Sequence, residues 1–287
     1  MKQPKIVYYH DLIHDDFAGT NIDTQTVPAD YRYISRSPLY RAAAFGVYHL
    51  FARPLVTVAV KVHYHQRFVG KWAFRRAFRK ALKQGGGKGA FLYANHTMLT
   101  GDAFIPNIID YRRKNYIVTG ADAVSIKGIR CLVKMLGALP LSASPNGMRA
   151  FCSAVETRVR EGKTVTVYPE AHIWPYYTGI RPFAATSFRY PVQCGVPVFV
   201  ITNVFKKRRL SLFSRPRVVS YVDGPFYPDP ALSARAAAQD LRDRVYAAMC
   251  ARAALSDYEY IRYLPAEEQE QEDQTAAGWS AGKENIK

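Results

Sequence analysis

The stretch that decides the fold is residues 144–170, "SPNGMRAFCSAVETRVREGKTVTVYPE". Its first part predicts a helix, because Ser144 can cap the start, Pro145 suits the first helical position and Gly162 can end it. The apolar residues of this helix recur every three or four positions and are Met148, Cys152, Val155 and Val159. The run at 164–170 is short and rich in β-branched residues, which predicts a buried strand. A helix that leads directly into a strand is typical of an α/β fold.

Strand and helix signals alternate on both sides of this unit. Short apolar runs predict further strands at 89–94, 115–120, 197–204 and 217–222. Residues 63–84 predict a helix that stops at Gly85-Gly86-Gly87, and residues 229–255 predict a long helix that begins just after Asp229. The alternation predicts an α/β domain with a mostly parallel sheet and helices on both faces.

The chain has 287 residues, which suits one large α/β domain with extensions or two small domains. We expect an N-terminal arm and interfacial helical segment at 1–62, the α/β domain at 63–255, and an acidic, disordered tail at 256–287. The arm up to residue 38 is expected to be irregular, since its apolar residues show little periodicity.

The most apolar long stretch is residues 39–62, which Arg53-Pro54 divides into the runs 42–52 and 54–60. A membrane span needs about 20 apolar residues, and neither run reaches that length. The pattern fits a membrane-associating helix that lies at the interface, and it fits a core helix kinked at Pro54 equally well.

The formal net charge of +17 favours anionic partners, such as nucleic acid, acidic lipid or a phosphorylated substrate. Because no helix-turn-helix, zinc finger or single-strand-binding motif occurs, we expect a lipid membrane surface as the partner and no nucleic acid. The four cysteines follow no ligand spacing, which predicts reduced thiols and no metal site. The first residues lack the apolar core of a signal peptide, so we expect the protein at the cytoplasmic face of a membrane.

Polar side chains follow two of the predicted strands. Asn95 and His96 come directly after 89–94, and Glu170 ends 164–170. The carboxyl ends of parallel strands meet at one edge of a sheet, where ligands bind. His96 can remove a proton from a hydroxyl group if Asp102, six positions later, orients its ring. On this spacing alone, a strand cap and a helix cap remain the simpler explanation.

Four blocks of sequence follow one another in a specific order: "ANHTMLTGD" at 94–102, "VYPEAHIW" at 167–174, "RPFAATS" at 181–187 and "GVPVFVIT" at 195–202. As an ordered set, which covers roughly residues 80–225, they resemble the glycerolipid acyltransferase family, that is, enzymes like 1-acyl-sn-glycerol-3-phosphate acyltransferase. The resemblance implies a transfer of a fatty acyl chain from acyl-coenzyme A or acyl-carrier protein to a lysophospholipid hydroxyl. It implies no metal and no cofactor other than that co-substrate.

The resemblance also implies roles for particular residues. His96 and Asp102 would form the catalytic base, and Asn95, Glu170 and Gly179 would bind or position the acceptor. No serine or cysteine nucleophile adjoins His96, so the base would activate the hydroxyl of the substrate itself.

The chain departs from the family pattern at three points. Five residues separate the histidine from the aspartate where the family has four, and Gly101 can absorb the extra residue as a bend. Two arginines that the family is expected to use for the acceptor phosphate are missing, near Ala143 and at 171–173. We expect Arg181, or else Arg149, to take over that role.

Three alternatives remain open at this point. The acceptor can be a polyol or a lipid without a phosphate, such as an ornithine lipid or a glycolipid. The chain can be a non-catalytic, basic membrane-binding or nucleic-acid-binding protein on the same scaffold. A soluble esterase is the weakest alternative, because no Gly-x-Ser-x-Gly motif occurs.

Overall fold

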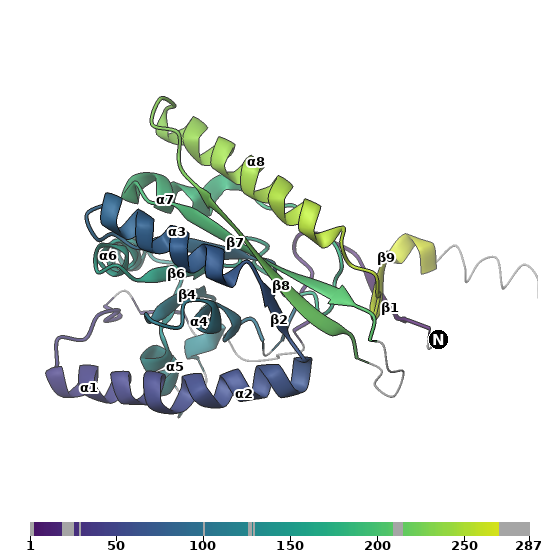
Figure 1. Cartoon of the computed structure of the whole chain (residues 1–287), viewed down its shortest axis with the longest axis horizontal. Coiled ribbons are helices and arrows are strands. Elements are labelled where there is room, and N and C mark those ends of the chain that lie inside the picture. The colour runs from purple at the N-terminus through teal and green to yellow at the C-terminus, as the bar shows by residue number, and fades with distance from the viewer. Residues whose placement is uncertain are drawn as a thin grey trace, which may run out of the picture.

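A seven-stranded sheet forms the centre of the structure (Figure 1). The computed structural model describes residues 3–18, 26–28, 30–99, 101–125, 128, 130–208 and 215–269. In spatial order the strands are β2 (Arg67–Val69), β8 (Arg217–Phe226), β7 (Val198–Lys206), β3 (Ala90–Ala94), β6 (Thr164–Val167), β4 (Asn115–Thr119) and β5 (Ala138–Pro140). Every neighbouring pair is parallel except β7 with β8, which confirms the mostly parallel sheet.

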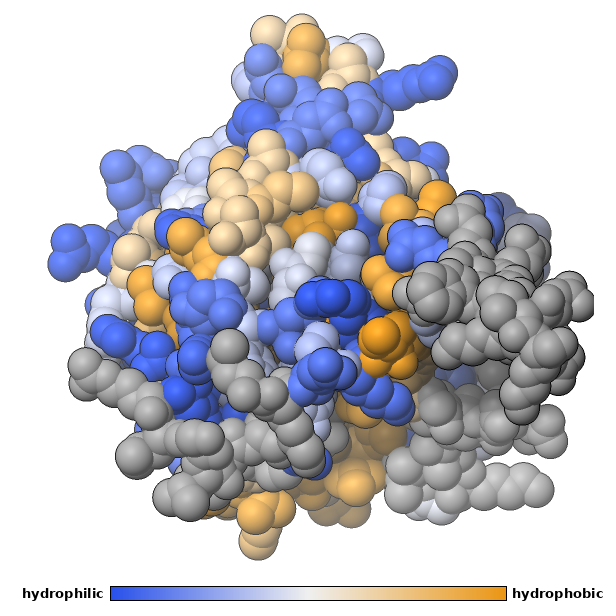
Figure 2. All heavy atoms as spheres, turned by 90° about the vertical axis from the view of Figure 1, so that its right-hand side faces the viewer, coloured by the Kyte–Doolittle hydropathy of each residue, from blue (hydrophilic) through white to orange (hydrophobic). Residues whose placement is uncertain are grey.

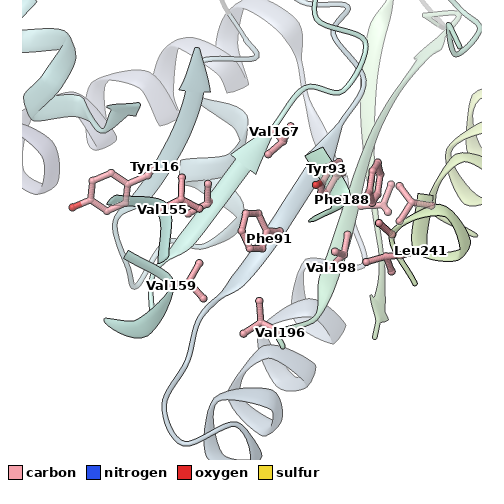
Figure 3. Close-up of a cluster of buried hydrophobic side chains, with 14 of the residues drawn as sticks. Phe91, Tyr93, Tyr116, Val155, Val159, Val167, Phe188, Val196, Val198 and Leu241 are labelled. Atoms are coloured by element: carbon pink, nitrogen blue, oxygen red, sulfur yellow. The ribbon is translucent and has the colours of Figure 1, made fainter. Parts of the chain in front are cut away.

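Helices cover both faces of this sheet. They are α3 (Lys71–Gln84), α4 (Ile105–Ile109), α5 (Arg130–Leu136), α6 (Pro145–Arg160), α7 (Arg189–Cys194) and α8 (Ala234–Ala253). Successive side chains of β3 point to opposite faces, as in any strand. Phe91 and Tyr93 join a core with residues of α6 and α8 (Figure 3). Leu92 joins a second core with residues of α3 and α4. The central strands are buried on both faces, which explains why they are uniformly apolar.

The unit that decided the fold forms as expected. The Ser144 hydroxyl accepts a hydrogen bond from the Gly147 N–H at 3.1 Å, and Pro145 is the first residue of α6. Gly162 ends the helix with a φ of 72°, a conformation that glycine adopts without strain. The chain then enters β6, so that Tyr168 and Glu170 follow the carboxyl end of a central strand.

Two predicted helix starts are wrong. Residues 63–84 do not form one helix, because β2 comes first and a turn at Gly70 separates it from α3. β2 is a short edge strand that pairs with β8, and a contact so distant in sequence leaves no local signal. The last long helix does not begin after Asp229. Its cap is Ser233, whose hydroxyl accepts from the Ala236 N–H at 3.4 Å.

Two segments from the N-terminal and C-terminal parts of the described chain form a second, two-stranded sheet. β1 (Lys5–Tyr9) pairs in parallel with β9 (Ile261–Pro265). The prediction of an irregular arm is therefore wrong at β1, and the prediction of a disordered tail is wrong for its first part. Packing explains why these segments are ordered, since Tyr263 stacks on Trp174 with ring centroids 4.7 Å apart. The rest of the tail, 270–287, lies outside the described residues.

The apolar segment forms one continuous helix of α1 (Pro38–Gly46), a π-helical stretch (Val47–Ala52) and α2 (Arg53–Tyr64). Arg53-Pro54 divides the apolar run but not the helix, which continues through Pro54 after the π-helical turns. Within the described residues this is the one helix, over Pro38–Val62, that is long and apolar enough to cross a membrane, and 22 % of its most apolar window is buried. Arg53 anchors it to the α/β domain through a hydrogen bond to the Arg113 carbonyl oxygen at 3.0 Å.

Candidate active site

His96 and Asp102 meet beyond the carboxyl end of β3. The Nδ1 atom of His96 lies 2.8 Å from Oδ2 of Asp102. The His96 side chain is 24 % exposed and the Asp102 side chain 3 % exposed, so the ring reaches solvent while its partner is buried. The extra residue between them is taken up in a tight turn in which the Asp102 N–H bonds to the Met98 carbonyl oxygen at 3.1 Å. A Cβ atom on Gly101 would lie 2.8 Å from the end of the Met98 side chain, so a larger residue at this position would require that side chain to shift.

The carboxylate of Asp102 is held from several sides. It accepts hydrogen bonds from the Met98 N–H at 2.9 Å and from the Asn203 amide at 3.3 Å. Burial raises the pKa of Asp102, and its hydrogen bond with His96 acts in the opposite direction. Because Nδ1 of His96 is directed at this carboxylate, Nε2 is the nitrogen left to exchange a proton with a substrate.

Tyr168 completes the support of the imidazole ring. It follows β6 and stacks on His96, with ring centroids 4.5 Å apart and an angle of 27° between the planes. Its hydroxyl donates to the backbone carbonyl oxygen of Asp102. Burial raises the pKa of Tyr168 well above its ordinary value, which keeps the hydroxyl protonated as a donor. Sequence reasoning missed Tyr168 and Asn203. The position of Tyr168 directly before Pro169-Glu170 was the available signal.

Asn95 has a structural role that the sequence did not predict. Its amide donates to the Asn203 carbonyl oxygen at 3.1 Å, and its Oδ1 accepts from the Asn203 N–H at 2.8 Å. The side chain is 1 % exposed and ties the end of β3 to β7. This geometry contradicts the expected contact with the acceptor, because the amide is committed to the neighbouring strand.

Arg181 is also committed to the protein. It is 1 % exposed, and its Nε lies 3.3 Å from Oε2 of Glu170. Its Nη atoms donate to four backbone carbonyl oxygens, those of Leu12, Ile13, Glu170 and His172. The guanidinium also packs over the Trp174 ring at 5.0 Å. The expectation that Arg181 binds the acceptor phosphate is therefore contradicted: every nitrogen of the guanidinium already has an acceptor.

Glu170 is buried beside Arg181, and its pKa responds to the charge of His96. Burial raises the pKa of Glu170 to about 7, while the charges of Arg181 and His96 lower it. Its Oε1 is buried and has no hydrogen-bond partner among the described residues. Such an oxygen is costly to leave unpaired, so a donor from a bound molecule would stabilise it.

The remaining predicted residues are not joined to this group. Arg149 is exposed on α6, where its guanidinium bonds to Oδ1 of Asn146 at 2.6 Å. Gly179 lines a separate cavity beside the end of α8. Among the described residues, which include these four, neither Arg149 nor Gly179 has a hydrogen bond or ion pair with His96 or Glu170. Over the described ranges, no three His, Cys, Asp or Glu side chains are grouped so that they could hold a metal ion.

Comparisons with known proteins give a family and a similar solved structure. The family model described as Acyltransferase matches residues 59–203. A solved structure, the 1-acyl-sn-glycerophosphate (LPA) acyltransferase PlsC from Thermotoga maritima, is similar at 16% identity and a TM-score of 0.41, over 74% of this chain and 92% of that chain. No curated protein matches the sequence.

Proposed function

The chain belongs to the acyltransferase family, and we propose that it moves a fatty acyl chain from a thioester donor to the hydroxyl of a lysophospholipid such as 1-acyl-glycerol-3-phosphate. The observation that supports this most directly is the 2.8 Å contact between His96 and Asp102, inside the segment that matches the family. The donor would be acyl-coenzyme A or acyl-carrier protein, and the product a membrane phospholipid.

In the proposed mechanism His96 acts as the general base. Nε2 takes the proton of the acceptor hydroxyl as that oxygen attacks the thioester carbonyl carbon. The new C–O bond forms, the C–S bond breaks, and the proton passes from Nε2 to the departing thiolate. Asp102 and Tyr168 hold the ring, and Asp102 stabilises the imidazolium that forms in the transition state.

The same proposal places the enzyme on a membrane through the helix of α1 and α2. Its exposed apolar side chains form a stripe: Leu39, Phe45, Leu50, Phe51, Leu55, Val58 and Val62. Figure 1 shows that this helix lies along one side of the domain, and Figure 2 shows hydrophobic residues along the lower edge of the molecule, where that helix ends. Because Arg53 and Tyr48 bind the helix to the domain, it would lie in the interface rather than span the bilayer.

Removing part of this apolar stripe is expected to weaken membrane binding. Phe51 is 71 % and Leu55 72 % exposed, so Phe51→Ser/Leu55→Ser removes little packing within the protein. We expect at least a tenfold loss of binding to neutral phosphatidylcholine vesicles in a flotation assay, since both side chains would enter the interface. A double variant that floats as well as the original protein would show that lipid contact lies elsewhere.

A panel of acceptors tests the reaction itself. Purified protein is incubated with radiolabelled acyl-coenzyme A and with lysophosphatidate, a lysoglycolipid, an ornithine lipid or glycerol, and the lipid products are separated. We expect label in a new ester of one lipid acceptor and none with His96→Ala. Release of free fatty acid alone, with no acceptor labelled, would indicate hydrolysis of the thioester donor and contradict the proposal.

The contacts of Arg181 and Arg149 favour a second class of acceptor. Arg181 is paired with Glu170 and with backbone oxygens. The guanidinium of Arg149 bonds to Asn146 on the exposed surface of α6, so neither arginine offers a phosphate site beside His96. An acceptor lipid without a phosphate would need no such site. Faster turnover with the lysoglycolipid or ornithine lipid than with lysophosphatidate would identify an acceptor without a phosphate.

A further inference from the structure

A second cavity lies at the opposite edge of the sheet from His96. Its volume is about 760 Å³, within the range of small-molecule sites. Arg112 and Lys114 line it from just before β4, and Lys163 lines it from just before β6. Since β3, β4 and β6 are parallel, their amino ends form this edge while their carboxyl ends carry His96 and Glu170. The cavity is therefore distinct from the candidate active site.

The lining of this cavity is strongly basic. It contains eight Lys and Arg residues and a single acid, Glu161. Among the described residues, only Arg158 of these eight cations lies within salt-bridge distance of a carboxylate, that of Glu161 at 2.9 Å. A concentration of positive charge without matching acids creates a local potential that attracts anions.

Aromatic rings, rather than carboxylates, hold several of these cations in place. Lys134 lies 5.2 Å from the Tyr31 ring and 5.9 Å from the Tyr40 ring, and Lys114 lies 5.2 Å from the Tyr116 ring. Such contacts orient an ammonium group but leave its charge uncancelled. Burial, together with the charges of Arg158 and Lys163, lowers the pKa of Lys114 to about 8. The protein thus keeps positive charges close together at an energetic cost that a bound anion would relieve.

The cavity borders the helix that carries the exposed apolar stripe. Arg41 and Phe45 of α1 line it, and Phe45 is 60 % exposed. Leu39, on the same helix, is 79 % exposed. A ligand in this cavity would therefore sit next to side chains suited to the hydrocarbon boundary of a membrane.

We propose that this basic cavity binds the phosphate headgroup of an anionic membrane lipid. Guanidinium groups match the geometry of phosphate oxygens, and the neighbouring apolar helix accommodates the acyl chains that a soluble anion lacks. The bound lipid would fix the protein on acidic membranes at a point separate from the reaction. The proposal does not depend on the proposed reaction, because binding can be measured on His96→Ala protein.

The test compares two variants that remove equal charge. Arg36→Gln/Arg41→Gln changes exposed cations of the cavity, and Arg217→Gln/Arg235→Gln changes exposed cations on β8 and α8. Full-length protein is titrated with phosphatidylcholine vesicles that contain 30 mol % phosphatidylglycerol, with pure phosphatidylcholine vesicles, and with soluble adenosine 3′,5′-bisphosphate.

We expect the cavity variant to bind phosphatidylglycerol vesicles about thirtyfold more weakly, the size expected for two basic residues at a membrane surface. The control variant should lose less than threefold, and the affinity of both for neutral vesicles should be unchanged. Equal losses in both variants would mean diffuse attraction and overturn the site. Binding of the bisphosphate that is lost in the cavity variant, with unchanged vesicle binding, would assign the cavity to a soluble ligand and overturn the lipid.

Discussion

Replacing His96 by alanine is expected to lower kcat/KM for acyl transfer by about 10³-fold while leaving the fold intact. A positioned general base contributes typically 10²–10⁴-fold, and the dyad with Asp102 puts His96 in that role. The imidazole is partly exposed and, among the described aromatic side chains, its ring stacks on Tyr168, so its loss creates no large cavity. Initial rates with the labelled donor and the best acceptor measure the effect, and circular dichroism checks the fold.

A matched histidine provides the control for that experiment. His172 lies on the loop after β6, and its nearest acid is Asp16, with 3.6 Å between Nδ1 and Oδ2. The side chain is 38 % exposed, so His172→Ala should keep turnover within about threefold of the original protein. Near-normal turnover in His96→Ala, or an equal loss in both variants, would remove the basis for assigning His96 as the base.

Arg181→Met is expected to lower the free energy of unfolding by roughly 3–5 kcal/mol, because it leaves a buried acid without its ion-pair partner. The loss extends beyond Glu170, since the guanidinium also satisfies backbone carbonyl oxygens of Leu12 and Ile13 in the N-terminal arm. Urea unfolding at pH 7 measures the change. The exposed Arg149→Met is the matched control and should change stability by less than about 0.5 kcal/mol.

A double variant keeps this prediction testable if Arg181→Met alone does not fold. Glu170→Gln/Arg181→Met replaces both members of the pair with neutral groups and should recover part of the lost stability. The opposite result would be an Arg181→Met protein of normal stability whose KM rises for lysophosphatidate but not for acceptors without phosphate. That result would restore Arg181 as a phosphate ligand and contradict the packing described above.

Local patterns predicted the elements that are buried on both faces or capped by their own residues. The strands β3, β6 and β7 are short apolar runs, and α6 has its own cap, its first-turn proline and its closing glycine. These signals lie within a few residues of the element they specify. The short edge strand β2 and the terminal strands β1 and β9 lack them, because each is specified by a partner elsewhere in the chain.

The candidate site divides in a similar way. His96, Asp102 and Glu170 could be named because the sequence blocks that contain them resemble the acyltransferase family, and the position of His96 and Glu170 after strands of a parallel sheet agrees with that resemblance. The tasks of Asn95 and Arg181 could not be predicted, because a polar residue at a strand end can face a ligand or a neighbouring strand. Only the positions of β7 and of the N-terminal arm show that both side chains are used within the protein.

By itself, the sequence determined the α/β architecture and the edge of the sheet that carries the histidine, because periodicity, caps and strand ends are local properties of a chain, and its ordered blocks carried the resemblance to the family. The tertiary structure alone decided which polar groups remain available to a ligand. In the folded protein Arg181 and Asn95 are buried, and cations that lie between residues 36 and 163 in the sequence line one cavity. Availability depends on which distant segments satisfy a donor or cancel a charge, and those contacts exist only once the chain has folded.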